Sequence, residues 1–561
     1  MKKIKSIAFV FCALFAQVLP AQQLQLPLNR QWSLEADAQF IKDTALHVHS
    51  SMRPVRETSR MKYTDYVSAN IGYGDFSCNQ DTATGFGKKV SAWCCRKHHG
   101  ESFINVRHSG EDGWLNLRID PLFNLQYGKK DFSDTAVSAT SFMNTRGVMA
   151  RGDIGNKFSF ETSFWENQST FPDYIKAFND KYLVVPGQGR WKKFKTRGYD
   201  YAMASGYMSY SPCKNFNVQL GHGKHLVGDG YRSLLLSDNS FNYPYARFTT
   251  NFRSWLQYTN IYASLMNLIP GGNNIPPGTE RLFQKKAASF HHLNVRIFKK
   301  KRLQLGVFQG LIWEAADTNN RQHLNFHYFN PVMFTSLPHY GLNSSKNAML
   351  GLTWKWRFMR SIEWYGQCML DEKGEKKKPG SIHNKRGFQA GVKYFNVLRI
   401  PHLHLQLEYN QVRPYAYATR DSLQNWSHYN QALAHPLGAN FKEYIGFLNY
   451  KIRDFYIELR YSVAEVGADS SGRSFGSNIF ASDHDAFYGV NSTVNEIGQG
   501  VSTNIVHQEV RIGYVLSYAT NLNLFAGYSN RIFTAAGSPE MQTPLIYFGL
   551  RTALNNLYWD F

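Results

Sequence analysis

The segment Lys157–Glu166 reads KFSFETSFWE and decides the fold class. Successive side chains of a β-strand point to opposite faces, so Phe158, Phe160 and Phe164 share one face while charged and hydroxyl residues share the other. A soluble sandwich turns such an apolar face inward. Aromatic side chains facing lipid and polar side chains facing a water-filled interior are typical of a transmembrane barrel.

The same alternation recurs along most of the chain, interrupted by turn residues. It predicts about eighteen strands at 114–128, 143–153, 156–166, 199–211, 215–222, 244–252, 255–266, 288–298, 302–313, 347–358, 360–371, 387–396, 401–412, 440–451, 453–463, 505–515, 520–530 and 543–553. Backbone groups in hydrocarbon need internal partners, so strands in a membrane must close into a barrel. We therefore expect an all-β fold, a transmembrane antiparallel outer-membrane β-barrel.

The connections between these segments alternate between short and long. The long ones are 129–142, 167–198, 223–243, 267–287, 314–346, 372–386, 413–439, 464–504 and 531–542. Outer-membrane barrels pair tight periplasmic turns with extended extracellular loops. An even number of strands also returns both ends of the barrel to the periplasmic side.

The first residues predict export. Met1–Ala21 has three lysines, an apolar run and a small residue before polar Gln22, which is the pattern of a cleaved signal peptide. No later stretch has the 18 consecutive apolar residues of a membrane helix, and the mean hydropathy is −0.41 while 15% of residues are aromatic. Together these features favour the cell outer membrane as the location.

We divide the chain into three parts on this basis. Residues 1–21 form the signal peptide, residues 22–113 an N-terminal periplasmic or lumenal segment, and residues 114–561 the barrel. The first of these boundaries rests on the cleavage pattern, and the second on the point where strand alternation begins. The N-terminal segment shows some helical character at LEADAQFIKD and no clear strand period.

The net charge of the mature chain indicates which classes of partner to expect. Without the three lysines of the signal peptide, 60 Lys and Arg face 41 Asp and Glu, an excess of 19 positive charges. In an exported protein this excess points away from nucleic acid and toward lipid, lipopolysaccharide phosphate or an anionic surface polysaccharide; the alternative is a solvated basic rim.

Five mature cysteines suggest at most a local disulfide, with Cys78 and either Cys94 or Cys95 as the favoured pair.

The segment Val218–Arg247 reads VQLGHGKHLVGDGYRSLLLSDNSFNYPYAR and breaks the strand pattern. It predicts a strand, a long structured excursion and a return strand after Pro244. Glycines there allow tight turns, and the polar side chains suit a loop that folds into the lumen, with Asp229 and Arg232 pairing with the walls. The predicted plug residues are His222, Lys224, His225, Asp229, Tyr231, Arg232, Ser237, Asp238 and Asn239.

The same segment invites two other interpretations. His222 and His225 lack a third ligand at metal-binding spacing. His222 with Ser233 or Ser237 would suggest a hydrolase, but no G-x-S-x-G elbow accompanies them. We predict no catalytic residue, no metal site and no cofactor.

Gly228–Asn239, GDGYRSLLLSDN, followed by Pro244, resembles the signature segment of Wzi-like capsule assembly proteins, which are outer-membrane barrels. The closer resemblance is to the Bacteroidetes branch that includes the gliding motility protein RemB, in which GHGK precedes this segment. Further matching segments are LPLNR at 26–30, ENQ at 166–168, PGQG at 186–189, LAHPLGANF at 433–441 and WDF at 559–561. The resemblance implies a non-enzymatic barrel that binds or organises surface polysaccharide; the alternatives are a RemB-like accessory barrel for gliding or secretion and a substrate-selective porin.

Two further segments suggest partners. Residues 186–200, PGQGRWKKFKTRGYD, place cations beside aromatic rings, a combination that suits an acidic sugar polymer or a merely solvated loop. The predicted polysaccharide-binding residues are Trp191, Lys192, Lys193, Lys195 and Arg197. Leu557–Phe561, LYWDF, resembles in part the signal read by the outer-membrane assembly machinery, with Asn556 where that signal has glycine. Motility or secretion proteins are expected partners only under the RemB-like alternative.

Overall fold

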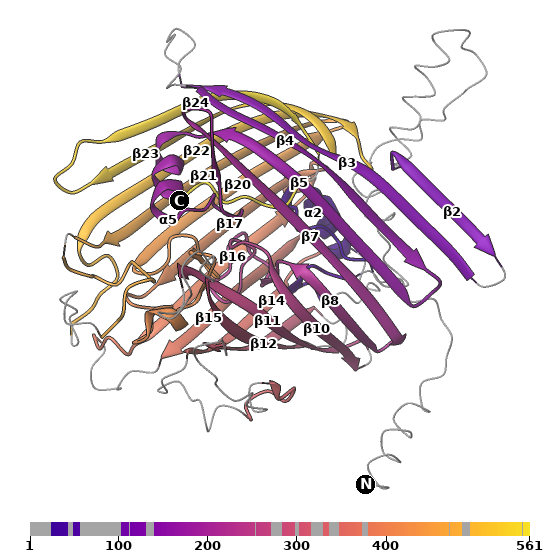
Figure 1. Ribbon diagram of the computed structural model, residues 1–561, viewed down its shortest axis with the longest axis horizontal. Coiled ribbons are helices and arrows are strands. Elements are labelled where there is room, and N and C mark those ends of the chain that lie inside the picture. Colours follow the sequence, from indigo (N-terminus) through magenta and orange to yellow (C-terminus); the bar gives the residue numbers. More distant parts are fainter. Residues whose placement is uncertain are drawn as a thin grey trace, which may run out of the picture.

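The predicted alternation is realised as a closed wall of eighteen antiparallel strands in the computed structural model (Figure 1). The wall strands are β3 (Gly113–Lys129), β4 (Thr140–Ile154), β5 (Phe158–Thr170), β7 (Gly198–Cys213), β8 (Phe216–Gly223), β10 (Tyr243–Phe252), β11 (Leu256–Pro270), β12 (Phe283–Ile297), β13 (Leu303–Glu314), β14 (Asn347–Arg357), β15 (Ile362–Glu372), β16 (Lys385–Phe395), β17 (Leu403–Val412), β20 (Phe441–Ile452), β21 (Phe455–Ala468), β22 (Val501–Ser517), β23 (Leu522–Ala535) and β24 (Met541–Arg551). Each of the eighteen predicted segments is one of these strands, with ends that shift by at most five residues.

The structure describes residues 24–42, 49–56, 102–110, 113–130, 140–252, 254–270, 283–297, 302–315, 329–335, 347–372, 380–470, 472–484, 494–552 and 554–561. The predicted signal peptide and the predicted pairing of Cys78 with Cys94 or Cys95 lie outside these residues. The remaining elements are α2 (Arg30–Lys42), α5 (Asp173–Tyr182), the 3-10 turns η4 (Val397–Arg399) and η5 (Ser422–Gln424), and the short strands β1 (Met52–Arg53), β2 (Ile104–Gly110), β6 (Lys192–Phe194), β9 (Leu226–Val227), β18 (Ser427–His428) and β19 (Gln431–Ala432). No helix among the described residues is long and apolar enough to cross a membrane.

The two faces of the wall have opposite chemistry. On β5, Phe164 points outward with 54% of its surface exposed, and its neighbour Ser163 points inward and is 8% exposed. The same contrast holds around the barrel, where Leu220, Leu352 and Ile512 are exposed. An apolar exterior and a polar lumen are the pattern of a barrel in lipid. The fold is that of an outer-membrane β-barrel.

The barrel closes along a short seam. β24 pairs with β3 over six residue pairs, from Ile546 with Lys129 to Arg551 with Asn124. β2 pairs with the first part of β3, from Ile104 with Ile119 to Gly110 with Gly113. One edge of β3 is therefore shared by β24 and by a strand from the N-terminal segment, in which the sequence pattern predicted no strand.

One predicted connection is wrong. Residues 531–542 were expected to form a long loop, but β23 and β24 extend the ladder as far as Phe533 with Met541, and only residues 536–540 connect them. The glycine, proline and glutamate of that turn gave the surrounding residues a loop-like composition. The strand ends joined by the other long connections lie at one end of the barrel, which we take as the extracellular end by the pattern of outer-membrane barrels.

Residues 24–42 and 49–56 of the N-terminal segment lie inside the barrel, and α2 lies at the end with the short turns. Leu34, Ala38 and Ile41 of α2 pack on Phe395 at the end of β16. The guanidinium of Arg30 pairs with Glu458 of β21 at 3.0 Å. Of the two predicted positions, periplasmic or lumenal, these residues take the lumenal one, whereas residues 104–110 form β2 beside the wall.

The closed wall predicts a stable barrel in detergent. Far-UV circular dichroism should be dominated by strand, and an unboiled sample should migrate differently on a gel from a boiled one because the closed wall resists unfolding by detergent alone. A mostly helical spectrum would contradict the fold.

Candidate functional site: the filled lumen and its outer face

The segment 224–242 leaves β8 and folds against the inner wall before β10 begins. Gly228 has φ +122°, and a Cβ there would lie 2.0 Å from the amide nitrogen of Gln367 on β15. A Cβ on Gly230 would lie 2.6 Å from a carboxylate oxygen of Glu408 on β17. Glycine at these two positions therefore lets the backbone lie directly on wall side chains.

Asp229 joins three parts of the chain. Its carboxylate accepts hydrogen bonds from Ser50 at 2.7 Å and Ser51 at 2.6 Å, and it pairs with Lys355 of β14 at 2.8 Å. Burial raises the pKa of Asp229, but the ammonium of Lys355 and nearby cations outweigh burial and hold the pKa well below its usual value. The ionised carboxylate thus fastens the N-terminal segment and the loop to the wall.

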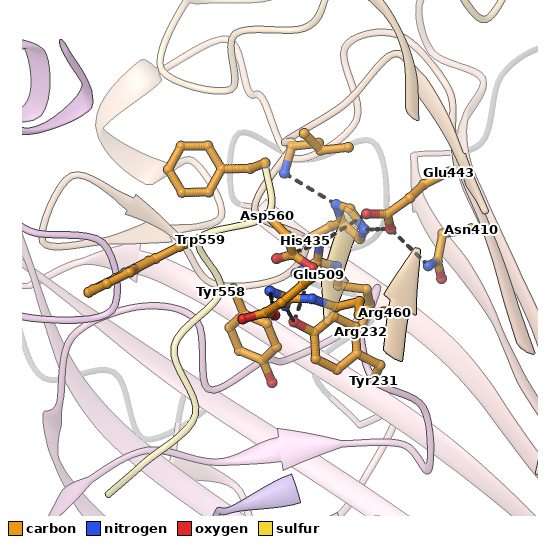
Figure 2. Close-up of polar contacts among 12 residues, drawn as sticks. Tyr231, Arg232, Asn410, His435, Glu443, Arg460, Glu509, Tyr558, Trp559 and Asp560 are labelled. Atoms are coloured by element: carbon orange, nitrogen blue, oxygen red, sulfur yellow. Dashed lines mark hydrogen bonds and ion pairs between the residues drawn. The ribbon is translucent and has the colours of Figure 1, made fainter. Parts of the chain in front are cut away.

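Arg232 lies at the centre of a second ionic cluster (Figure 2). Its guanidinium pairs with Glu443 of β20 at 3.0 Å and with Asp560 at 3.1 Å, and the side chains of all three residues are at most 1% exposed. The ring of Tyr231 lies 4.7 Å from the guanidinium carbon. Because buried charges require opposite charges close by, this cluster determines where the loop and the C-terminal segment meet.

The C-terminal segment 554–561 also lies in the lumen. Asp560 accepts from the hydroxyl of Tyr231 at 3.1 Å and pairs with Arg460 at 3.2 Å, and the hydroxyl of Tyr558 donates to Asp238 at 2.6 Å. Phe561 packs on Phe178 of α5, with ring centroids 5.2 Å apart. These last residues therefore fill the interior and do not continue the wall, whatever part LYWDF plays in assembly.

An apolar core lies beside the ionic clusters. Leu234, Leu235 and Leu236 are fully buried and belong to one cluster with Phe290 of β12 and Trp426. The indole of Trp426 donates to the backbone oxygen of Leu235 at 2.8 Å. Burying each leucine stabilises the loop by about 1.5–3 kcal/mol. The loop 413–440, which carries Trp426, covers the segment 224–242 from the extracellular end.

Most of the other predicted plug residues are buried and contact neighbouring segments. The ammonium of Lys224 donates to the backbone oxygen of Gly187 at 2.6 Å, and burial lowers its pKa to about 8. His225 is buried against Tyr243 and Tyr245, and burial lowers its pKa well below the usual value. Asn239 donates to the backbone oxygen of Ala432 at 3.1 Å. Each of these side chains holds the loop to a neighbouring segment.

The hydroxyls and His222 are also engaged in structural contacts. Ser233 donates to the backbone oxygen of Val227 at 2.6 Å and accepts from the amides that follow it, and Ser237 accepts from the amide of Asn239 at 3.2 Å. The ring of His222, at the end of β8, lies 3.1 Å from the backbone oxygen of Ala204. The contacts of the described residues thus show no serine–histidine pair in this segment.

The five residues predicted to bind polysaccharide lie on one outer hairpin. β6 pairs with the start of β7, from Lys192 with Asp200 to Phe194 with Gly198. The side chains of Lys192, Lys193, Lys195 and Arg197 are exposed. Trp191 is half-buried: its indole donates to the backbone oxygen of Asn179 at 3.1 Å and meets Tyr199 edge-on at 4.7 Å. Trp191 therefore anchors the hairpin to α5 as well as presenting part of its ring.

A second set of aromatic residues near this hairpin was not predicted. Phe178, Tyr182, Phe480 and Phe561 are half-buried neighbours, with ring centroids 4.6–5.4 Å apart along the row. They line a cavity of about 80 Å³ together with the amide side chains of Asn239, Asn430, Gln431 and Asn478. The sequence offered no signal for this cavity, because its walls come from five segments that are separate along the chain.

Comparison with known proteins supports no closer assignment than the fold. No protein-family model matches the chain, and no curated protein matches it. Among solved structures, the chain is similar to Wzi of Escherichia coli, described as an outer membrane protein involved in group 1 capsule assembly and a carbohydrate-binding β-barrel, with a TM-score of 0.49, 12% identity, and coverage of 96% of this chain and 100% of that one.

The chain is also similar to two further outer-membrane barrels. OprD of Pseudomonas aeruginosa has a TM-score of 0.41 and 12% identity, with coverage of 81% of this chain and 98% of that one. OccAB2 of Acinetobacter baumannii has a TM-score of 0.42 and 8% identity, with coverage of 78% and 97%. Similarities this weak do not distinguish a capsule protein from a porin, so the fold rests on the strand pairing itself.

The ionic cluster predicts a large and specific loss of stability. Replacing Arg232 with Met leaves the carboxylates of Glu443 and Asp560 buried without their shared cation, which should destabilise the barrel by about 3–5 kcal/mol. Urea titration followed by the gel shift between folded and unfolded forms measures the change.

The matched control is Lys176→Met, which removes an exposed cation from its pair with Asp180, four residues along α5. Because water screens this pair, the change should stay below about 0.5 kcal/mol. Equal midpoints for the two variants would contradict the importance of the cluster.

The filled lumen predicts low conductance. Purified protein in a planar bilayer should pass little ion current, because segments 224–242 and 554–561 occupy the interior. Deletion of residues 223–240 should open the barrel or abolish its assembly. Large, steady conductance of the intact protein would contradict a closed lumen and favour a porin.

Proposed function

We propose that the protein is a non-enzymatic outer-membrane barrel of the Wzi-like capsule-assembly class, which binds or organises an anionic surface polysaccharide. One observation carries the proposal: a lumen packed with ionic and apolar contacts, capped at the outer end by exposed cations and half-buried aromatic rings. A barrel filled in this way acts at its outer face. The resemblance of Gly228–Asn239 to the signature segment of that class supports the same assignment.

The outer face has the chemistry that sugar polymers require. Aromatic rings stack on the apolar faces of sugar rings, and Tyr182, Phe480 and Phe561 present such rings around the cavity described above. Amide side chains such as Asn478 supply both donors and acceptors for sugar hydroxyls. The four exposed cations of the hairpin would pair with carboxylate groups along the polymer.

The cations also determine which polymers are favoured. Long basic side chains in solvent attract polyanions from a distance, and salt weakens this attraction. A neutral polymer would gain only from the rings and amides. We therefore expect acidic polysaccharide to bind better than neutral polysaccharide at low salt, and lipopolysaccharide to be the competing anionic partner.

A RemB-like role in gliding or secretion is the second candidate. The order GHGK followed by GDGYRSLLLSD at residues 221–238 favours it, because that order is a feature of the branch that includes RemB. In this case the outer face would contact a motility or secretion protein instead of a polymer. The experiment below separates the two, because only the first requires retention of polysaccharide.

Replacing Lys192, Lys193, Lys195 and Arg197 together with Ser should weaken retention of capsule by a deletion strain that carries the variant. The difference from the parent should shrink as salt rises, because the Debye length falls from about 10 Å at 0.1 M to about 3 Å at 1 M. Replacing Trp191 should also weaken retention but with less dependence on salt, since ring contacts are not charge interactions.

The matched control replaces Lys373, Lys376, Lys377 and Lys378, in another predicted loop, with Ser, which removes the same number of charges. This variant should retain capsule like the parent. If the hairpin variant behaves like the control at every salt concentration, the cations form a solvated rim, and paired motility and secretion assays on the same strains test the second candidate.

A further inference from the structure

Three metal-binding side chains meet at the periplasmic end of the barrel, away from the outer face. Glu35 comes from α2, and His402 and His404 flank the first residue of β17. One carboxylate oxygen lies 2.8 Å from Nδ1 of His402, and the other lies 3.1 Å from Nε2 of His404. The donor atoms of all three residues lie within 4.8 Å of one another.

The local structure explains why the two histidines converge. His404 lies on β17 and points into the lumen, whereas His402 lies in the turn just before the strand; both imidazoles meet Glu35. The turn before β17 has positive φ at Asn396, Leu398, Arg399 and His402. The amide of His402 donates to the side chain of Asn396 at 2.9 Å, and this contact fixes the position of the first imidazole.

Glu35 is held equally firmly. The contacts of α2 with Phe395 hold the helix against β16, and Glu35 is 7% exposed while His404 is 2% exposed. Its two carboxylate oxygens face the two imidazoles, so Glu35 can act as a ligand without movement of the helix.

There is also room for a fourth ligand. A cavity of about 40 Å³ adjoins the cluster and is lined by Glu35, His402, Lys451 and Tyr518, among others. A single water needs roughly 10–15 Å³ measured in this way. Two imidazoles, one carboxylate and a water form a donor set that suits Zn²⁺.

We propose that Glu35, His402 and His404 bind a divalent first-row transition-metal ion, with Zn²⁺ as the preferred ion. This ion fastens α2 to the turn between β16 and β17 at the periplasmic end of the barrel. The ion replaces the two hydrogen bonds to Glu35. The proton on each coordinating nitrogen moves to the other ring nitrogen or is released to solvent. For His404 this ends the weak contact of Nδ1 with the amide of Asn396, now 3.4 Å long.

The role of the ion follows from the contacts of the residues that come after α2 along the chain. α2 leads toward Ser50 and Ser51, which bond to Asp229 of the segment that fills the lumen. An ion linking α2 to the turn between β16 and β17 would therefore limit the movement of the N-terminal segment. This role is structural, and it is independent of any binding at the outer face.

The test uses intact protein in detergent, stripped with a chelator and titrated with ZnCl₂ by calorimetry and with CoCl₂ by visible absorption. We expect one ion per chain and cobalt bands typical of four or five ligands. Glu35→Gln, His402→Asn and His404→Asn should each weaken binding by at least about tenfold, since even indirect partners of a metal site are worth that much.

The matched control is His383→Asn, which alters a different histidine pair, with His484, whose rings are 5.4 Å apart. Its Zn²⁺ affinity should equal that of the parent. The gel shift between unboiled and boiled samples confirms that every variant is folded. In the folded parent, Zn²⁺ should slow and chelator should speed tryptic cleavage after Arg56, because the bond after Arg53 leads into Pro54 and resists trypsin.

Three outcomes would overturn the proposal. The first is no uptake of Zn²⁺ or Co²⁺ at micromolar concentrations by the folded parent. The second is unchanged affinity in a folded His402→Asn, His404→Asn double variant. The third is loss of binding in the His383→Asn control, which would place the ion at the surface pair. None of these outcomes bears on retention of polysaccharide, so the two proposals can fail separately.

Discussion

The guanidinium of Arg232, buried without access to water, is the charge on which the interior depends. Glu443 and Asp560 compensate it, and Asp560 is compensated in turn by Arg460. Arg460 pairs with Glu509, which also binds Arg511, and Arg511 faces Glu458, the partner of Arg30. Positive and negative groups thus alternate from the segment 224–242, through the C-terminal residues and the wall, to the N-terminal segment. Each group needs its neighbour, because an uncompensated charge in this environment costs several kcal/mol.

The lumen is polar and charged because the outer face of the wall must be apolar to lie in lipid. Apolar side chains such as Phe164, Leu220 and Ile512 face outward, so alternation along each strand turns polar side chains inward. An inner wall of this kind cannot be covered by an apolar plug alone. The segment 224–242 therefore carries both apolar and charged side chains. Leu234, Leu235 and Leu236 pack in an apolar cluster, while Asp229 and Arg232 pair with charged residues of the wall.

The sequence predicted the wall well, because apolar and polar residues alternate along each strand according to whether the side chain faces lipid or the lumen. All eighteen strands could be placed, and KFSFETSFWE already indicated which face meets lipid. The connection 531–542 was misjudged, since the strand ladder continues through residues of loop-like composition. The strand β2 was missed because it is short, with one brief alternation at Ile104–Arg107, and it pairs only with the first part of β3.

The sites were predictable only in part, because their contacts span long distances along the chain. Glycine spacing marked 222–239 as a structured excursion, and it named Asp229 and Arg232. It could not name Glu443 or Asp560, more than two hundred residues away. The pair His402 and His404 carried a signal in its spacing of two, but nothing along the chain links it to Glu35.

The interior is assembled from both ends of the barrel. The segment 224–242 enters from the extracellular end, whereas residues 49–56 and 554–561 enter from the periplasmic end, and they bond to one another through Asp229, Asp238 and Arg232. The contacts of each of these segments therefore depend on the others. β24 closes the seam with β3, and residues 554–561, which follow it, lie in the lumen. Closure of the wall and packing of the interior thus depend on neighbouring parts of the chain, so a change in either is expected to disturb the other.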